Sequence, residues 1–324
     1  MRAAVAVAQS LDDPLSGLSL KEMPDPEPKP GWTRVRVRAA SLNPHDVWTL
    51  RGVGHPAERI PMVLGCDGAG VTDAGDEVVI HPVLGDPNRG GGDVTLDPKR
   101  ALLSETVNGS LASFVLVPDA CVVPKPDWLG FDDAATLGIV WGTAYRMLFT
   151  RARVRAGDRV LVQGASGGVG SAAISLARAA GAKVYATART DAKRAFALEC
   201  GAHEVFESGA RLPERVDVVV DTVGEATWAH SLRSLQPGGV VVTCGATSGN
   251  MPPAELNRIF YQQLSVIGST GSTRSEFEAL LRFLEASGVR PHVDSVLPFD
   301  EIPAGFQRLI DGEVRGKLVV RISE

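Results

Sequence analysis

The sequence predicts an α/β fold, in which a doubly wound parallel sheet is combined with a second domain of short strands. Three observations carry this prediction. An apolar strand at 160–162 leads through a glycine turn into an alanine-rich helix at 171–180, and strands and helices then alternate up to residue 244. Residues 1 to 122, by contrast, contain short strand patterns between proline and glycine turns. Such alternation is typical of a parallel sheet with helices on both faces.

The remaining elements follow from apolar periodicity. Beyond the turn, strands are expected at 183–188, 216–220 and 240–244, and helices at 191–200 and 225–235. The strands at 216–220 and 240–244 are nearly continuous apolar runs, which indicates burial on both faces. Alternating residues predict half-buried strands at 34–39, 76–80 and 112–117. A helix at 275–286 precedes a last strand at 316–322, which is expected to return to the β domain.

The glycine turn at 164–170 (GASGGVG) has the composition of a dinucleotide pyrophosphate site. A strand-to-helix turn presents free backbone amides and the positive end of the helix dipole, and both suit phosphate oxygens. Gly167 and Gly168 would let the backbone approach the ligand, while Gly170 would let the helix pack closely. Ala165 replaces the first glycine of the usual pattern, so a turn without a ligand is the alternative.

The end of the second strand favours NADPH over NADH. An acidic residue at this place normally accepts hydrogen bonds from the ribose of NAD, and none is present. Arg189 follows the strand instead, and Lys193 comes one helical turn later. Arginine grips phosphate through its planar fork, so these two side chains predict a site for the ribose 2′-phosphate. The alternative is a solvated helix start.

Composition excludes several classes of protein. The chain has 324 residues, with 33 Lys and Arg against 38 Asp and Glu, so no basic surface for nucleic acid is expected. No run of eighteen apolar residues predicts a membrane span, and no signal peptide is recognised, which favours a cytoplasmic location. The 4 cysteines form no C-x-x-C pair, so a disulfide framework is not expected.

The chain resembles the medium-chain dehydrogenase/reductase superfamily, and within it the zinc-independent quinone oxidoreductase-like branch. The matching segments are 39–46 (AASLNPHD), 64–70 (LGCDGAG), 164–170, 221–224 (DTVG) and 316–320 (GKLVV). The resemblance implies a GroES-like catalytic domain formed by residues 1–122 and 268–324. It also implies a Rossmann NADPH-binding domain at 123–267.

Each position expected to bind the catalytic zinc ion differs from the zinc-dependent members. Those members carry a cysteine at the position of Asn43, the motif G-H-E at 65–67, and a further cysteine near 139–140. This chain has Gly-Cys-Asp at 65–67 and aliphatic residues at 139–140, so no metal is expected. An unusual site involving His45, Cys66 and Asp67 stays open. The region of the structural zinc lobe, 85–94, lacks cysteine and is expected to be a mobile loop.

The resemblance also assigns candidate contacts to the cofactor. They are Ser166, Gly167, Gly168 and Val169 for the pyrophosphate; Arg189 and Lys193 for the 2′-phosphate; Gly245 and Ala246 for the ribose region; Ile267, Gly268 and Ser269 for the nicotinamide edge; and Thr143 for the nicotinamide-side ribose or phosphate. For Thr143, a helix-packing role is the alternative.

Two residues are candidates for catalysis. Asn43 matches an asparagine near the nicotinamide in this branch and would donate a hydrogen bond to the substrate carbonyl or the cofactor ribose. His45 is the candidate proton donor, because an imidazole with an ordinary pKa of about 6.5 suits that role. A loop histidine hydrogen-bonded to backbone is the alternative for His45.

The expected activity is reduction of a quinone or an α,β-unsaturated carbonyl by NADPH. Without zinc no Lewis acid polarises a simple ketone, so acceptors that take hydride readily are favoured. An enoyl or tailoring reductase of a biosynthetic pathway and a cofactor-binding protein without turnover are the alternatives. A small-molecule substrate is expected, with no nucleic-acid or membrane partner, and the strand at 264–267 is a candidate edge for a homodimer.

Overall fold

The structure is a computed structural model that describes residues 1–323. Backbone contacts divide it into two compact units. Unit 1 contains residues 1–139, 272–281 and the chain from 293 onward, and unit 2 contains residues 140–271 and 282–292. Grouping by contact does not test where a functional domain begins, so the catalytic and nucleotide domains expected at 1–122 with 268–324 and at 123–267 stay predictions.

Unit 2 is built on one sheet of six parallel strands, as predicted for a doubly wound fold. The strands are β11 (Arg159–Val162), β12 (Lys183–Thr187), β13 (Glu204–Phe206), β14 (Val216–Asp221), β15 (Leu235–Thr243) and β16 (Ser265–Gly268). Their spatial order is β13-β12-β11-β14-β15-β16. The order reverses direction between β11 and β14, which is where ligands of such sheets bind.

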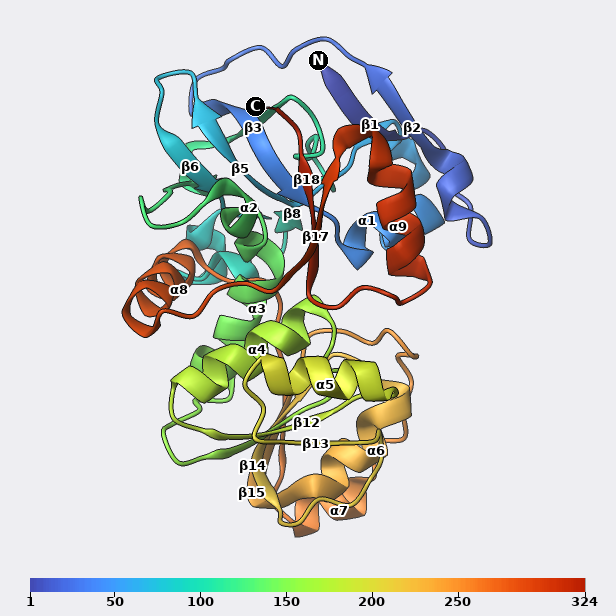
Figure 1. Ribbon diagram of the computed structural model, residues 1–324, viewed down its shortest axis with the longest axis vertical. Coiled ribbons are helices and arrows are strands. Elements are labelled where there is room, and N and C mark those ends of the chain that lie inside the picture. The colour runs from blue at the N-terminus through green and yellow to red at the C-terminus, as the bar shows by residue number, and fades with distance from the viewer. Residues whose placement is uncertain (324) are drawn as a thin grey trace. The chain divides into compact units, whose positions relative to one another are not determined.

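Helices cover both faces of this sheet. They are α4 (Gly168–Ala179), α5 (Asp191–Glu199), α6 (Glu225–Ser234) and α7 (Leu256–Tyr261), with the short α3 (Gly142–Tyr145) preceding β11. The chain moves outward in opposite directions from β11 and β14. Right-handed crossovers therefore place α4 and α5 on one face and α6 and α7 on the other, as Figure 1 shows.

Unit 1 contains most of the short strands. The seven-stranded sheet has the order β10-β6-β5-β3-β18-β17, with β9 also paired to β3, and a three-stranded sheet has the order β2-β1-β4. The bounds are β1 (Arg2–Ala6), β2 (Leu18–Glu22), β3 (Trp32–Ser41), β4 (Met62–Val63), β5 (Asp67–Thr72), β6 (Glu77–Ile80), β9 (Phe114–Pro118), β10 (Val122–Pro124), β17 (Val293–Pro298) and β18 (Lys317–Arg321). Strand β18 pairs antiparallel with β3, so the predicted return of the last strand is confirmed.

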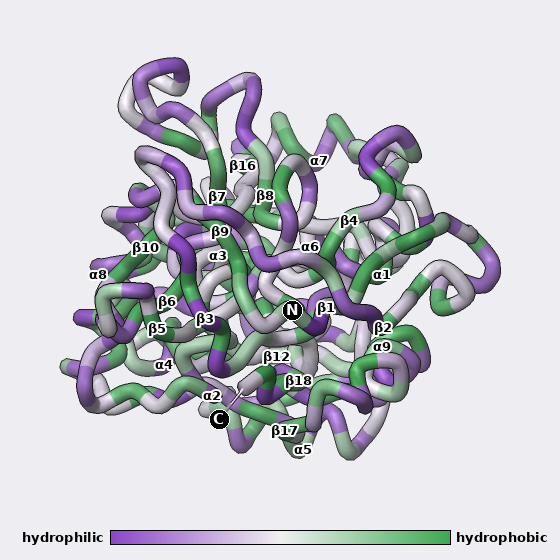
Figure 2. Tube along the Cα trace, turned by 90° about the horizontal axis from the view of Figure 1, so that it is seen from above, coloured by the Kyte–Doolittle hydropathy of each residue, from purple (hydrophilic) through white to green (hydrophobic). Residues whose placement is uncertain are grey.

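Hydrophobic residues follow the strands of unit 1, as in β9, which Figure 2 shows as mostly hydrophobic. Val35, Val37 and Ile80 are fully buried and belong to one apolar cluster. Full burial of each large apolar side chain contributes about 1.5–3 kcal/mol to folding. Because β3 lies inside this core, the residues at its end are held firmly, and they lead directly into the candidate site.

The remaining helices are α1 (Pro44–Arg51), α2 (Phe131–Ala134), α8 (Arg274–Ser287) and α9 (Ile302–Ile310). Helix α1 begins in a capping box, in which the Asp46 carboxylate accepts a hydrogen bond from the Asn43 amide at 3.0 Å. It ends at Gly52, which has a φ of 73°. These caps fix the segment that carries both candidate catalytic residues.

Residues 85–94 are expected to form a mobile loop, but this region contains two short 3-10 helices, Pro87–Gly90 and Val94–Leu96. They fold around the fully buried Asp97, whose carboxylate accepts hydrogen bonds from the amides of Asp86 and Lys99. The Arg89 guanidinium donates to the same carboxylate at 2.8 and 3.0 Å and holds the pKa of Asp97 well below its usual range. An ion pair thus organises the segment that corresponds to the structural zinc lobe.

Two predictions from composition can be compared with the structure. All 4 cysteines of the chain lie within the described residues and are free there. Among residues 1–323, no helix combines the length and apolar character needed to cross a bilayer.

Candidate nucleotide site and active site

The predicted glycine turn connects β11 to α4. Gly164 adopts a φ of 65°, and a Cβ there would lie 2.7 Å from a methyl group of Val223. A Cβ on Gly170 would lie 2.6 Å from the carbonyl oxygen of Gly164. The close packing expected at Gly170 is therefore between the start of the helix and the glycine turn. Gly167 is the N-cap and has no side chain to cover the helix end. The amides of the first turn of α4 therefore have neither an intrahelical acceptor nor a side-chain cap.

Helix α4 begins at Gly168, three residues earlier than the predicted helix at 171. Ser166, Gly168 and Val169 are all partly exposed, and Gly167 is exposed. The four residues assigned to the pyrophosphate thus form the turn and the first helical residues. This arrangement of exposed amides at a positive helix end can bind phosphate oxygens.

Two cations lie at the start of α5, at the C-terminal end of β12. Arg189 is exposed and has no ion-pair partner within residues 1–323. Thr190 caps the helix by accepting a hydrogen bond from the Lys193 amide. Burial and the nearby charge of Arg189 lower the pKa of Lys193. An anion bound between Arg189 and Lys193 would relieve their repulsion, so the pair fits a phosphate group.

The other predicted cofactor residues also lie in unit 2. Gly245 and Ala246 follow the end of β15, and Ile267, Gly268 and Ser269 form and follow the end of β16. They therefore share the C-terminal edge of the sheet with the glycine turn. The Ser269 hydroxyl is buried without a hydrogen-bond partner in the described residues, which leaves a polar group for a ligand. Thr143 lies in α3 and is buried, so its helix-packing alternative stays open.

A buried polar network holds the carboxyl ends of β11, β12 and β14 together. The Thr187 hydroxyl donates to Oε1 of Gln163 at 2.5 Å, and Gln163 Nε2 contacts His230 Nδ1 at 2.8 Å. Gln163 also donates to Ser231, whose hydroxyl donates to Asp221 at 2.7 Å. A fully paired buried network rigidifies its surroundings. Sequence reasoning did not identify this network, because its members are single polar residues at the ends of separate elements.

A second buried cluster lies at the end of β3 in unit 1. Lys317 Nζ lies 3.1 Å from Asp67 Oδ2 and donates to Asn43 Oδ1 at 2.6 Å. Asn43 Nδ2 and the Ser41 hydroxyl each donate to the same Asp67 oxygen at 2.9 Å. The backbone amide of Ile139 donates to Asp67 Oδ1 at 2.5 Å. Lys317 is 4% exposed and Asp67 is 0% exposed, so this is a buried ion pair with its hydrogen bonds satisfied.

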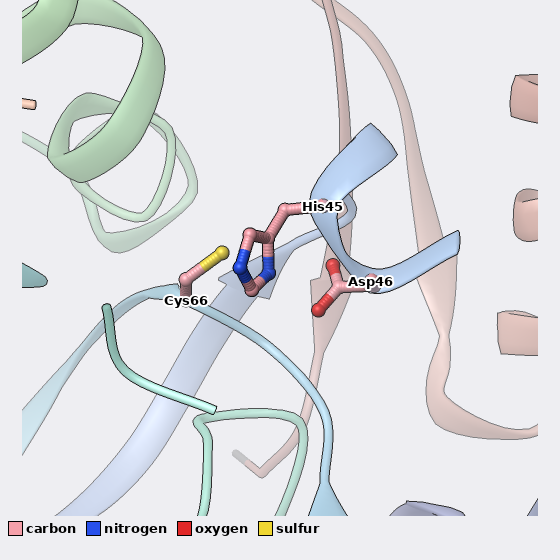
Figure 3. Close-up of side chains that lie close together, drawn as sticks. All are labelled: His45, Asp46 and Cys66. Carbon is pink, nitrogen blue, oxygen red and sulfur yellow. The ribbon is translucent and has the colours of Figure 1, made fainter. Parts of the chain in front are cut away.

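His45 lies in the first turn of α1. Its Nε2 lies 3.0 Å from Glu105 Oε1, while its Nδ1 is buried without a partner in the described residues. Figure 3 shows the imidazole between the thiol of Cys66 and the carboxylate of Asp46. One ligand atom from each of these three residues lies within 4.8 Å of the others. The partner of His45 is thus a carboxylate and not a backbone group, which differs from the alternative of a loop histidine bonded to backbone.

Asp46 and Cys66 have features of structural residues. The two Asp46 oxygens accept hydrogen bonds from the backbone amides of Asn43 and Gly65, at 3.0 and 2.8 Å. Burial, reinforced by the carboxylates of Asp46 and Asp67, raises the pKa of the Cys66 thiol well above its usual range. Cys66 is therefore held as a neutral thiol, consistent with a small buried side chain.

Lys317 and Glu105 were not identified as functional candidates from the sequence. Lys317 carried a usable signal, because a lysine within an apolar strand predicted to be buried requires an anionic partner. Glu105 carried none, since it lies in a polar segment and meets His45 across 60 positions of sequence.

Family models match most of both regions. The model described as alcohol dehydrogenase GroES-like domain matches residues 29–127, and the model described as zinc-binding dehydrogenase matches residues 168–286. The first range contains Asn43 and His45, and the second begins at Gly168, the first residue of α4.

Complete proteins are also similar over nearly the whole chain. A quinone oxidoreductase of Mus musculus is 31% identical, covering 91% of this chain and 90% of its own. An acryloyl-coenzyme A reductase of Metallosphaera sedula is 30% identical, covering 94% and 96%. A crystal structure titled NAD-dependent alcohol dehydrogenase superposes with a TM-score of 0.92 at 36% identity and covers 100% of both chains.

Proposed function

Because the chain belongs to the medium-chain dehydrogenase/reductase superfamily, on its quinone oxidoreductase-like branch, we propose that it is an NADPH-dependent reductase of quinones or α,β-unsaturated carbonyls that acts without catalytic zinc. As a member of this superfamily, the chain is an oxidoreductase. The observation that carries the finer proposal is the buried pair of Lys317 and Asp67, which determines what the candidate active site can hold.

A catalytic zinc ion fits these residues poorly. A zinc site requires three protein ligands and an open position. The Asn43 oxygen accepts a hydrogen bond from the Lys317 ammonium, and Asp67 is fully engaged by four donors. Ile139 has an aliphatic side chain and supplies only its backbone amide. A metal cation placed here would also be repelled by the ammonium group.

The group formed by His45, Asp46 and Cys66 is no better suited to zinc. Cys66 is fully buried, and burial raises the pKa of its thiol in the metal-free protein. Asp46 already caps α1, and His45 Nε2 already faces a carboxylate. These contacts support a structural role for Asp46 and Cys66, with His45 left as the reactive side chain.

The unit 2 site fits NADPH, which supplies hydride to the acceptor when it is bound. The turn at 166–169 would hold the pyrophosphate, and Arg189 with Lys193 would hold the 2′-phosphate. Thr143, Gly245, Ala246 and residues 267–269 would position the nicotinamide half. This assignment rests on the free amides at α4 and on the two repelling cations at α5.

Replacing Arg189 by alanine tests the choice of cofactor. We expect the Kd for NADPH to rise about tenfold to a hundredfold, because a hydrogen bond to a charged group contributes about 1.5–3 kcal/mol. The Kd for NADH should hardly change. Fluorescence titration with both cofactors measures this, and the exposed Arg211 replaced by alanine is the control. Equal affinities of the unaltered protein for NADPH and NADH would contradict the assignment.

His45 is the proposed proton donor, and Asn43 has a positioning role in the proposal. Hydride addition to a quinone or enone produces an oxyanion or enolate that must gain a proton. His45 Nδ1 is free to give one, whereas both polar ends of the Asn43 side chain are engaged within the protein. A hydrogen bond from Asn43 to substrate would thus require it to exchange a partner, and this part of its expected role stays a prediction.

A second candidate is reduction of an enoyl thioester, which the acryloyl-coenzyme A reductase relative favours. The third alternative, cofactor binding without turnover, would leave the same site intact. Loss of NADPH absorbance with a panel of a quinone, an enone, an enoyl thioester and a simple aldehyde separates them. We expect turnover with the quinone or the enone. Turnover confined to the thioester would support the second candidate, and tight binding with no turnover the third.

We also propose that two copies pair along β16. This strand forms one edge of the sheet, and Val266 on it is 45% exposed. Phe260 and Tyr261 of the adjacent α7 are 67% and 78% exposed. An apolar open edge of this kind is a template for pairing with a second chain. The proposed cytoplasmic location and the proposed lack of nucleic-acid and membrane partners rest on composition alone.

Sedimentation tests the dimer. We expect twice the 34.2 kDa chain mass for the unaltered protein and the single-chain mass after Val266→Arg, which places a charge on the edge. Leu11→Arg, at another exposed apolar position, is the control and should leave the dimer intact. A single-chain mass for the unaltered protein at every concentration would rule the pairing out.

A further inference from the structure

The imidazole of His45 has one fixed ring nitrogen and one unused ring nitrogen. Nε2 lies 3.0 Å from Glu105 Oε1, and the side chain as a whole is 17% exposed. Nδ1 is buried and has no hydrogen-bond partner within residues 1–323. Buried polar atoms without partners are rare in native proteins, and each requires an explanation. An oxygen of a bound substrate would supply the missing partner.

Glu105 is itself held in place by its own segment. Its Oε2 accepts a hydrogen bond from the Leu102 amide at 2.7 Å, and its carbonyl oxygen accepts one from the Arg59 guanidinium at 3.0 Å. A carboxylate oxygen can only accept, so the proton of a neutral His45 must reside on Nε2. The contact therefore fixes both the orientation of the ring and its tautomer, with the lone pair on Nδ1.

We propose that Glu105 is the positioning residue for His45, directing Nδ1 as the atom that protonates the reduced substrate. This inference rests on the proposed function. Hydride adds to the acceptor, and the electron pair displaced from its π system settles on the carbonyl oxygen. The Nδ1–H bond of the imidazolium breaks as a new O–H bond forms, which leaves neutral His45 with its Nε2–H still directed at Glu105. A proton from water then restores the imidazolium.

The charges around His45 favour the imidazolium form. Burial opposes the charge, but the hydrogen bond to Glu105 and the negative charges of Asp46, Glu105 and Asp67 outweigh it, so the pKa of His45 is raised. Burial raises the pKa of Asp46, but both of its oxygens accept hydrogen bonds from backbone amides, which hold it as a cap of α1. Burial and the Arg59 charge lower the pKa of His55, which keeps it neutral, and Cys66 is a neutral thiol.

Glu105→Gln tests the proposal because it removes the charge and keeps the shape. A group with a raised pKa stays protonated to higher pH, so kcat should fall as pH rises through the pKa of His45. In the variant this fall should move to lower pH. We expect kcat near neutral pH to drop about tenfold to a hundredfold, part of the roughly 10²–10⁴-fold that a positioned general acid contributes. The Kd for NADPH should not change.

A readout independent of turnover comes from nitrogen NMR of the His45 ring in the unaltered protein. We expect the Nε2–H tautomer when the ring is neutral and a titration midpoint above that of an exposed histidine. Glu58→Gln, at an exposed carboxylate in the neighbouring turn, is the matched control and should change neither readout.

The outcomes separate this inference from the proposed function. An Nδ1–H tautomer, or a pH profile unchanged by Glu105→Gln in an active enzyme, would overturn the role of Glu105 and leave the reductase proposal standing. Failure of every acceptor would overturn the reductase proposal. The NMR titration would still decide whether Glu105 fixes the ring of His45.

Discussion

We expect Gly168→Asp to abolish NADPH binding while the protein stays folded. Gly168 is the first residue of α4, so its side chain would project where the turn presents amides to the pyrophosphate. A carboxylate there would repel the phosphate, and it would interact with the positive N-terminal end of α4 in place of the pyrophosphate. Each lost hydrogen bond to phosphate costs about 1.5–3 kcal/mol, so we expect affinity to fall by more than about a hundredfold. A binding titration measures the effect.

The fold should tolerate this change, because an acidic residue in the first turn of a helix is stabilising. Circular dichroism and the melting temperature check that it does. Ser275→Asp places the same charge at the exposed first turn of α8 and should leave NADPH affinity unaltered. Unchanged affinity of the Gly168→Asp protein would count against the whole cofactor site.

We expect Lys317→Met to lower the free energy of unfolding by about 3–5 kcal/mol, because it leaves the buried Asp67 carboxylate without its cation. The ammonium is also the donor to Asn43 Oδ1, so the first residue before α1 loses a contact as well. Urea unfolding measures the loss, and Lys21→Met at an exposed site is the control. Adding Asp67→Asn to Lys317→Met removes the buried charge and should recover part of the stability.

A Lys317→Met protein as stable as the original would mean that the ammonium and the carboxylate are not coupled. A buried cation would then no longer oppose zinc binding at Asn43. The two variants together therefore test both the stability that the buried ion pair contributes and the proposal that zinc does not bind at Asn43.

Much of unit 2 could be predicted because its signals are local. Val216–Asp221 is a nearly continuous apolar run, so its sequence alone predicts a strand buried in a parallel sheet. The sequence likewise indicates where the strand before Arg189 ends. The first and last residues of the elements were predicted less accurately than the elements themselves. Strand β15 begins at Leu235, five residues before the predicted strand, because it pairs with Val216 across a register shift that the sequence does not reveal.

The parts that could not be predicted depend on contacts between distant residues. Nothing near Glu105 indicates that it meets His45, and nothing near residue 97 indicates that its buried carboxylate organises the segment expected to be mobile. Helix α9 was also not predicted, and it supplies Phe306 to the core of unit 1. Local pattern thus predicts the strands and helices of unit 2 better than it predicts contacts between distant residues.

The most direct test is turnover by protein from which metals have been removed. The protein is dialysed against a strong chelator, its zinc content is measured, and NADPH consumption is followed with a quinone and an enone. We predict turnover of at least one acceptor at the same rate before and after dialysis, with zinc far below one ion per chain. Loss of activity on chelation that added zinc restores, with about one zinc ion bound per chain, would contradict the proposal.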